Sequence, residues 1–279
     1  MSLHFSPQLF AILSQLIEER LGLHYGAQDI SLLGERVSSR AVVAGFDSLL
    51  DYYYYLRYDE GSAEEMDRLA EALVVHETYF FREFEQLQVA VEHFIKPRVH
   101  ERGSAAVWSA ACSTGEEPLT LAMLLEEQNL LSRTRIIASD LSEQALRQAK
   151  EGTRSARSLR QNPRPDLVSR WLERSGERWT VSRQLREAIE WRKINLMEAA
   201  RALPPASIDV VLCRNVLIYF SDRGARAVIE QMEALLRPGG AIFVGVSESL
   251  MRLGTGLRCM EQHGVFYYMS DGSDSSCRR

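Results

Sequence analysis

The feature that most constrains the fold is a repeated alternation of strand-like runs and helical segments in the second part of the chain. Short, mainly apolar runs occur at 106–110, 135–140, 208–213 and 241–246, and amphipathic segments follow the first three. Strands that alternate with helices form βαβ units around a largely parallel sheet. We therefore expect an α/β domain over residues 99–270.

The first part of the chain has helical periodicity instead. Phe10, Leu13 and Ile17 recur at helical spacing, and Asp47 or Ser48 is expected to cap a helix that continues through tyrosines 52–55. Four consecutive tyrosines could stack on nucleic acid, but in a helix they point in different directions, which favours packing in the core and at its rim. We expect an all-helical domain and linker over residues 1–98.

Residues 153–192 do not fit the alternation of strands and helices. They are rich in arginine and contain Pro163, Pro165 and Gly176, with possible short strands at 179–181 and 189–191. We expect a small inserted β subdomain here. The polar end at 271–279 is expected to be a flexible tail.

Composition and charge exclude several classes of protein. A net charge of −5 argues against general nucleic-acid binding. We expect neither a secretory leader nor membrane insertion, because no apolar run approaches the ~20 residues that span a bilayer. The four cysteines have no metal-ligand spacing and are expected to be free thiols, as in a reducing cytosol. We therefore expect a soluble cytoplasmic protein.

The turn at 111–118 is the first candidate site. It joins a strand to a helix, and its small residues let a ligand approach the free N–H groups of the helix N-terminus. It lacks the G-x-G-x-x-G pattern, and Glu116 and Glu117 would repel a pyrophosphate. These acids suit a cationic ligand such as S-adenosylmethionine, whose ammonium and sulfonium are both positive. The alternative is an acidic first turn that the helix dipole stabilises.

Polar residues also follow the other strands. Asp140 ends the second strand, close to the roughly 20-residue offset at which an acid binds ribose hydroxyls, although such a residue can simply cap the next helix. Asn195-Leu196 and Arg214-Asn215-Val216 also follow strands. Ligands of open α/β sheets lie at the carboxyl ends of strands, so these segments are candidates for the same site.

Taken together, the segments WSAACSTGEEP, ASDLS, INLME and LCRNVLIYF resemble the bacterial chemotaxis receptor methyltransferases, the CheR family. ETYFFRE at 77–83 matches that family's interdomain segment, and GGAIFVGVSES at 239–249 resembles its late strand and turn. The similarity spans about residues 6 to 270. It implies a Rossmann-like methyltransferase domain that uses S-adenosylmethionine, releases S-adenosylhomocysteine and forms glutamyl methyl esters on the cytoplasmic helical bundle of chemoreceptors.

The resemblance also implies roles for individual residues. Glu117 or Glu116 would hold the methionine portion of the cofactor, and Asp140 its ribose. Thr78 and Arg82 match cofactor contacts, and His76 stands where asparagine is common. Two groups of residues complete the expected site. Around the adenine and the reacting end we expect Asn195, Leu196, Arg214, Asn215 and Val216. As groups that orient the acceptor we expect Arg98, Tyr219 and Arg82, although Tyr219 could equally pack beside Phe220.

A basic side of the helical domain, made by Arg36, Arg40 and Arg57, would dock the Glu-rich receptor, or would be a solvated helix face. The stretch 172–179 looks shorter than in members that tether to a receptor pentapeptide, so we predict a pentapeptide-independent enzyme. We also expect it to be a monomer. A glutamate with a pKa near 4.3 is already an anion at neutral pH, so the reaction needs no general base or metal. The alternatives are a small-molecule methyltransferase and a non-catalytic cofactor-binding adaptor.

Overall fold

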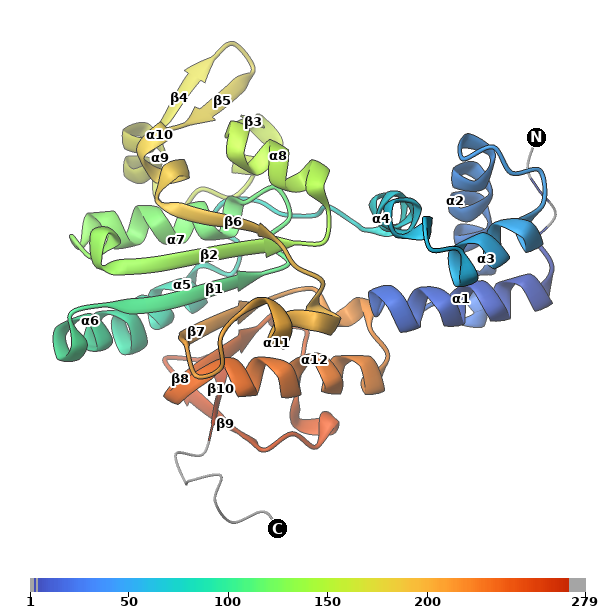
Figure 1. Ribbon diagram of the computed structural model, residues 1–279. Helices are drawn as coiled ribbons and strands as arrows, with labels where there is room; N and C mark the ends of the chain where they lie inside the picture. The colour runs from blue at the N-terminus through green and yellow to red at the C-terminus, as the bar shows by residue number, and fades with distance from the viewer. Residues whose placement is uncertain (1–2, 4, 271–279) are drawn as a thin grey trace.

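The N-terminal part of the chain is a helical domain that lies beside an α/β domain in the computed structural model, which describes residues 3 and 5–270 (Figure 1). The helices of the first domain are α1 Pro7–Leu21, η1 Ala27–Asp29, α2 Ile30–Val43, α3 Leu49–Tyr58 and α4 Ser62–Leu73.

The sequence sets the ends of these helices. Ser6 caps α1 by accepting a hydrogen bond from the Leu9 N–H at 3.2 Å, and Ser48, one of the two expected caps, does the same for α3. In α3 the tyrosines point in different directions, as predicted: Tyr52 is fully buried and Tyr54 is 52% exposed.

The α/β domain is built on a seven-stranded sheet with the order β6-β2-β1-β7-β8-β10-β9. The first five strands in this order are parallel, and β10 runs antiparallel to both of its neighbours. The strands are β1 Ala105–Ala110, β2 Thr134–Asp140, β6 Ile189–Lys193, β7 Ile208–Cys213, β8 Leu236–Val244, β9 Leu257–Gln262 and β10 Val265–Ser270. The expected βαβ architecture is confirmed.

Both faces of the sheet are covered, which is why its central strands are mainly apolar. In β1, Ala105 and Val107 join the core beneath α5, α6 and α7, whereas Ala106 and Trp108 join the core beneath α11 and α12. Successive side chains of a strand point to opposite faces, so a sheet between two helical layers needs continuous apolar runs. The helices are α5 Phe84–Ala90, η2 Val91–Ile95, α6 Lys96–Arg102, α7 Glu116–Glu127, η3 Leu131–Arg133, α8 Glu143–Glu151, η5 Leu196–Glu198, α11 Ala199–Ala202, η6 Leu217–Tyr219, α12 Asp222–Leu235 and η7 Met251–Leu253.

The domain boundary differs from the sequence prediction. Residues 84–98 were grouped with the helical domain and linker, but α5 and the π-helical turn η2 pack on the sheet through Leu87, Val91 and Ile95. Their apolar faces therefore belong to the α/β core, and the helical domain ends near Leu73. The expected tail at 271–279 lies outside the described residues.

The expected inserted subdomain forms a three-stranded antiparallel sheet with the order β3-β5-β4. Its elements are β3 Thr153–Ser155, η4 Ala156–Leu159, α9 Pro165–Trp171, β4 Leu172–Ser175, β5 Arg178–Val181 and α10 Arg183–Glu187. The run at 189–191 pairs with β2 as part of β6, so the insert ends before residue 189 and is shorter than predicted.

The two domains meet at the ends of β2, β6 and β7. Gly22 adopts φ +77°, and an added Cβ would lie 2.2 Å from the ring of Phe220, so glycine is needed where α1 approaches the α/β domain. The His24 N–H donates to the Tyr219 carbonyl at 2.8 Å. On the other side Glu71 accepts a 2.5 Å hydrogen bond from the Ser142 hydroxyl. These contacts place the helical domain over the carboxyl edge of the sheet.

Candidate active site

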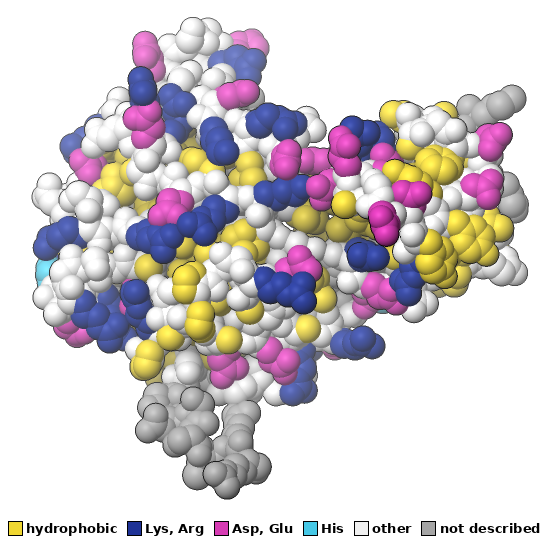
Figure 2. All heavy atoms as spheres, in the orientation of Figure 1, with side chains coloured by type: hydrophobic (Ala, Val, Ile, Leu, Met, Phe, Trp, Pro, Cys, Tyr) yellow, Lys and Arg dark blue, Asp and Glu magenta, His cyan; other side chains and the backbone are white. Residues whose placement is uncertain are grey.

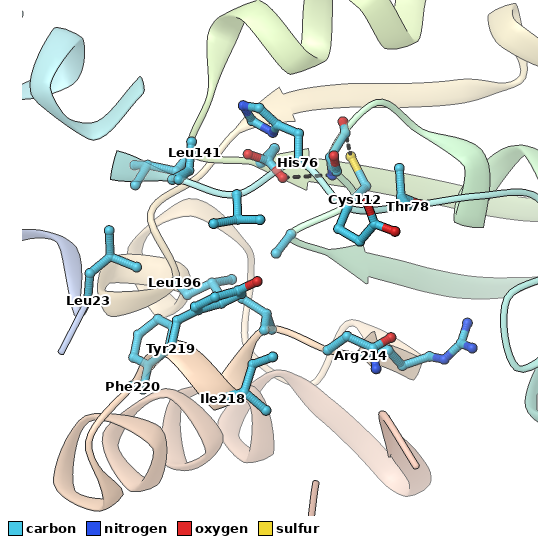
Figure 3. A pocket seen from close by; sticks show the side chains of 18 of the residues that line it. Leu23, His76, Thr78, Cys112, Leu141, Leu196, Arg214, Ile218, Tyr219 and Phe220 are labelled. Atoms are coloured by element: carbon cyan, nitrogen blue, oxygen red, sulfur yellow. Dashed lines mark hydrogen bonds between the residues drawn. The ribbon is translucent and has the colours of Figure 1, made fainter. Parts of the chain in front are cut away.

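A cavity of about 590 Å³ lies between the helical domain and the carboxyl ends of the parallel strands. Figure 3 shows His76 and Thr78 on one side of it, across from Leu196 and Tyr219. Most of the sequence-predicted site residues line the cavity: His76, Thr78, Arg82, Glu117, Asp140, Asn195, Leu196, Arg214, Asn215, Val216, Tyr219 and Arg36. The structure therefore brings together segments that lie far apart in the sequence.

The turn after β1 has an unusual backbone. Ala111, Ser113 and Gly115 have φ values of +56°, +51° and +93°, a region that non-glycine residues rarely adopt. At Gly115 an added Cβ would lie 2.8 Å from the Trp191 ring, so no larger residue fits. The turn ends at the N-terminus of α7 and brings Ser113 and Glu117 to the cavity.

Asp140 holds this turn and also faces the cavity. One carboxylate oxygen accepts a 2.7 Å hydrogen bond from the Ser113 N–H, and the other accepts a 2.9 Å bond from the Ser142 N–H. Burial raises the pKa of Asp140, although these two hydrogen bonds oppose the shift. Each carboxylate oxygen has a second lone pair, so the group can cap the turn and still accept a ligand hydroxyl. The two interpretations of Asp140 from the sequence are therefore compatible.

Glu117 and Arg214 form a buried ion pair at the cavity wall. The Arg214 Nη1 lies 2.9 Å from one Glu117 oxygen, and the Ser109 hydroxyl donates to the other at 2.6 Å. Burial raises the pKa of Glu117, against the opposing effects of Arg214 and Ser109. The second terminal nitrogen of Arg214 lies 3.2 Å from Glu83 and donates to the Arg82 carbonyl. Arg214 thus connects the end of β7 to the interdomain segment.

Glu116 points elsewhere. Its side chain is 1% exposed, does not line the cavity and lies 3.0 Å from the Arg154 guanidinium of the insert. The sequence left Glu116 and Glu117 open as alternatives, and the assignment of Glu116 to the cofactor is wrong. On a helix, neighbouring residues point in different directions, so only one of the pair can face the cavity.

The interdomain segment supplies one wall. The Arg82 Nη1 donates to the Glu77 carbonyl at 2.9 Å, and its guanidinium lies 5.7 Å from the centre of the Tyr79 ring. His76 is exposed and close enough to Asp140 for a positive charge on the imidazole to lower that carboxyl's pKa.

The two asparagines hold the surrounding backbone. The Asn195 amide donates to the Arg20 carbonyl at 2.7 Å, which ties the end of α1 to the sheet. Asn215 adopts φ +58°, its N–H donates to Glu248 at 2.7 Å, and its side-chain amide donates to Glu83 at 3.0 Å. Both asparagines line the cavity.

The two predicted catalytic residues, Arg98 and Tyr219, lie at opposite ends of the sheet. Tyr219 lines the cavity, but Arg98 lies on α6 and donates to the Pro238 carbonyl at 2.9 Å, near the start of β8. It also lies 3.9 Å from Asp209, at the start of β7. The cavity is at the other end of β7, about 16 Å away at the rise of a strand. The assignment of Arg98 to the catalytic site is therefore wrong.

The three predicted docking arginines lie in different environments. Arg40 makes two 2.6 Å hydrogen bonds to Glu65 in the helical core, so its assignment to docking is wrong. Arg57 pairs with Glu19 at the surface, and Arg36 lines the cavity and donates to the Leu73 carbonyl at 2.6 Å. In the view of Figure 2, basic and acidic side chains are interspersed over the helical domain rather than gathered in one basic surface.

Two acids that hold the lining residues Arg214 and Asn215 in place were not predicted. Glu83 and Glu248 each bind several groups around Asn215, and Glu248 also accepts from the Gly245 N–H at 2.7 Å. Both lie inside motifs that carried the family resemblance, which was the available signal. Across residues 3 and 5–270, no cluster of three or more histidine, cysteine or acidic side chains could hold a metal ion, and no helix is long and apolar enough to cross a membrane.

Comparisons with known proteins bear on this site. Residues 8–74 match the family described as CheR methyltransferase, all-alpha domain, and residues 76–266 match CheR methyltransferase, SAM binding domain. Chemotaxis protein methyltransferase 2 of Vibrio cholerae is 33% identical over 240 residues, which cover 84% of this chain and 83% of that protein. Chemotaxis protein methyltransferase 1 of Pseudomonas aeruginosa is 30% identical over 253 residues, covering 88% and 91%.

Proposed function

Because the chain belongs to the CheR methyltransferase family, with S-adenosylmethionine as its cofactor, we propose that it methylates glutamate side chains on the cytoplasmic helical bundle of bacterial chemoreceptors. The observation that carries the proposal is the cavity between the two domains, where Glu117 and Asp140 meet Thr78 and Tyr219. It lies in a chain whose relatives are named chemotaxis protein methyltransferases.

The cavity fits the cofactor in size and charge. Its volume of about 590 Å³ lies in the range of small-molecule sites. Glu117 would bind the ammonium of the methionine portion, because its carboxylate is the acid that faces the cavity from the first turn of α7. Asp140 would accept a ribose hydroxyl beside the Ser113 N–H. Leu196 and Val216 would contact the adenine and the reacting end.

The cofactor supplies an electrophilic methyl group on a positively charged sulfur. Transfer of that methyl to a glutamate oxygen would form the ester, and the electron pair of the carbon–sulfur bond would stay on sulfur. The acceptor carboxylate is an anion at neutral pH, so no proton has to be removed from it. The protein's task is to align the two groups and exclude water, and Arg82 and Tyr219 would orient the carboxylate.

Acceptor docking would use the part of the helical domain nearest to the cavity. Arg36 and Arg82 both line the cavity, so their positive charges would attract an acidic segment. Arg57 would contribute less, because Glu19 already neutralises it at the surface. Recognition would therefore depend on charge close to the site rather than on an extended basic face.

The test is transfer of labelled methyl from S-adenosylmethionine to purified cytoplasmic fragments of candidate receptors. We expect base-labile label on glutamate, and no label when the modified glutamates are replaced by alanine. A matched enzyme control is Asp47→Ala, an exposed aspartate before α3, which should transfer at the wild-type rate.

Binding of S-adenosylhomocysteine without transfer to any receptor fragment would contradict the receptor substrate. Label recovered only on small molecules would then favour a small-molecule methyltransferase. The same protein with no transfer to either class would favour a non-catalytic adaptor. Absence of S-adenosylhomocysteine binding by the wild-type protein would contradict the placement of the cofactor.

A further inference from the structure

The first segment of the insert, residues 153–160, contacts the turn at 111–118 through side chains that do not line the cavity. We call residues 111–118 the cofactor turn and residues 153–160 the anchor segment. The Arg154 guanidinium donates to the Thr114 carbonyl, and its Nε lies 3.0 Å from a Glu116 oxygen. The side chains of Arg154 and Glu116 are only 3% and 1% exposed. A buried ion pair beside a hydrogen bond fixes a position because both charges would be left uncompensated if they separated.

Glu116 extends the contact to the rest of the anchor segment. One of its oxygens accepts a 2.7 Å hydrogen bond from the Thr114 hydroxyl, and the other accepts a 3.0 Å bond from the Ser158 hydroxyl. Besides Asp140 at the end of β2, side chains that do not belong to the main sheet therefore also hold the turn at 111–118 in its conformation.

The anchor segment also holds the interdomain segment. The Ser158 carbonyl accepts a 2.8 Å hydrogen bond from the Phe80 N–H. Arg160 pairs with Glu77 at 2.5 Å, and its guanidinium lies 3.7 Å from the centre of the Tyr79 ring. These contacts flank Thr78 and precede Arg82, both of which line the cavity.

One short segment thus joins two walls of the cavity, although Arg154, Ser158 and Arg160 do not line it. We propose that Arg154 is a positioning residue, which sets cofactor affinity by holding the Thr114 carbonyl and Glu116 so that the turn and the interdomain segment keep the spacing the cofactor requires. This inference rests on the proposed placement of the cofactor in the cavity. It gives the insert a role in the reaction that does not involve contact with a receptor.

The test is calorimetric titration of the full chain with S-adenosylhomocysteine. Arg154→Met is expected to raise Kd about tenfold or more, because small displacements of positioning groups weaken a site strongly. Arg154→Lys keeps the charge but lacks the planar fork, so we expect partial rescue, with Kd between the two. The KM for S-adenosylmethionine should rise in parallel, and kcat at saturating cofactor should stay near the wild-type value.

The controls separate positioning from folding. Arg183→Met removes an exposed arginine of the same insert, which pairs with Glu187, and should leave Kd unchanged. If Arg154→Met does not fold, the double variant Arg154→Met/Glu116→Gln removes the uncompensated buried carboxylate and should still bind about tenfold more weakly.

Folded Arg154 variants with wild-type Kd and lowered thermal stability would overturn the inference, because Arg154 would then be only structural. If Asp140→Ala weakens binding in the same assay, the proposed function stands while this inference fails. If the wild-type protein does not bind S-adenosylhomocysteine at all, the placement of the cofactor fails, and this inference with it.

Discussion

Replacing Asp140 tests the placement of the cofactor most directly. Its carboxylate accepts hydrogen bonds from the N–H groups of Ser113 and Ser142, and both lie in a buried environment. Asp140→Ala leaves two N–H groups without this acceptor, at about 1–3 kcal/mol each, so unfolding should become about 2–6 kcal/mol easier. Binding is affected separately. Loss of a charged hydrogen bond to the ribose weakens the binding free energy by about 1.5–3 kcal/mol, which raises Kd for S-adenosylhomocysteine about 10- to 150-fold.

The two effects can be separated. Asp140→Asn keeps one acceptor oxygen, so it should lower the free energy of unfolding by about half as much as Asp140→Ala does. It should still bind S-adenosylhomocysteine more weakly than wild type. Urea unfolding gives the change in stability, and calorimetric titration well below the melting temperature gives Kd. Asp47→Ala serves as the control for loss of an exposed aspartate. Asp140 does not bind the cofactor if both variants are folded and bind S-adenosylhomocysteine within about twofold of wild type.

Three further predictions concern other charged groups. Burial raises the pKa of Glu117 above its usual 4.5, so the free folded protein gains relative stability below that pH and loses it as pH rises through the raised pKa. Protonation removes the negative charge of Glu117, so affinity for the cationic cofactor should begin to fall while the pH is still above 4.5. Calorimetric titrations at a series of pH values should show a flatter dependence of Kd on pH for Glu117→Gln. Arg98→Ala should lower stability by about 1 kcal/mol in urea unfolding and leave methyl transfer unchanged; a large loss of kcat would restore Arg98 to the active site. Arg40→Ala breaks the pair with the buried Glu65 and should destabilise the chain by about 2–4 kcal/mol, whereas unchanged stability with weaker receptor binding would return Arg40 to docking.

Elements with strong periodicity were predictable from the sequence because their own residues carry the signal. The strand expected at 208–213 is observed as Ile208–Cys213, and Ser48 caps α3 as one of the two expected residues. The placement of 84–98 failed for a physical reason. An amphipathic helix shows that it buries one face, but not which domain provides the partner surface.

The candidate site was also predictable in part from the sequence and in part only from the structure. Acids and amides after strands predicted a ligand site at the carboxyl edge, because parallel strands bring their ends together whatever the loops contain. The choice between Glu116 and Glu117 could not be made from sequence, since it depends on Arg154 of the insert. Arg98 and Arg40 looked available as positive charges, but Asp209 and Glu65, which lie far from them in the chain, lie beside these guanidinium groups.

The sequence by itself therefore determined the order of the main strands and helices, the candidate turn at 111–118 and the family. These depend on local patterns and on contiguous motifs. Only the tertiary structure decided which of two neighbouring glutamates faces the cavity, which arginines are neutralised and how the insert holds the cofactor turn. Those outcomes depend on pairs of buried charges brought together by folding, and the energy of a charge is set by the partner and the burial it meets there.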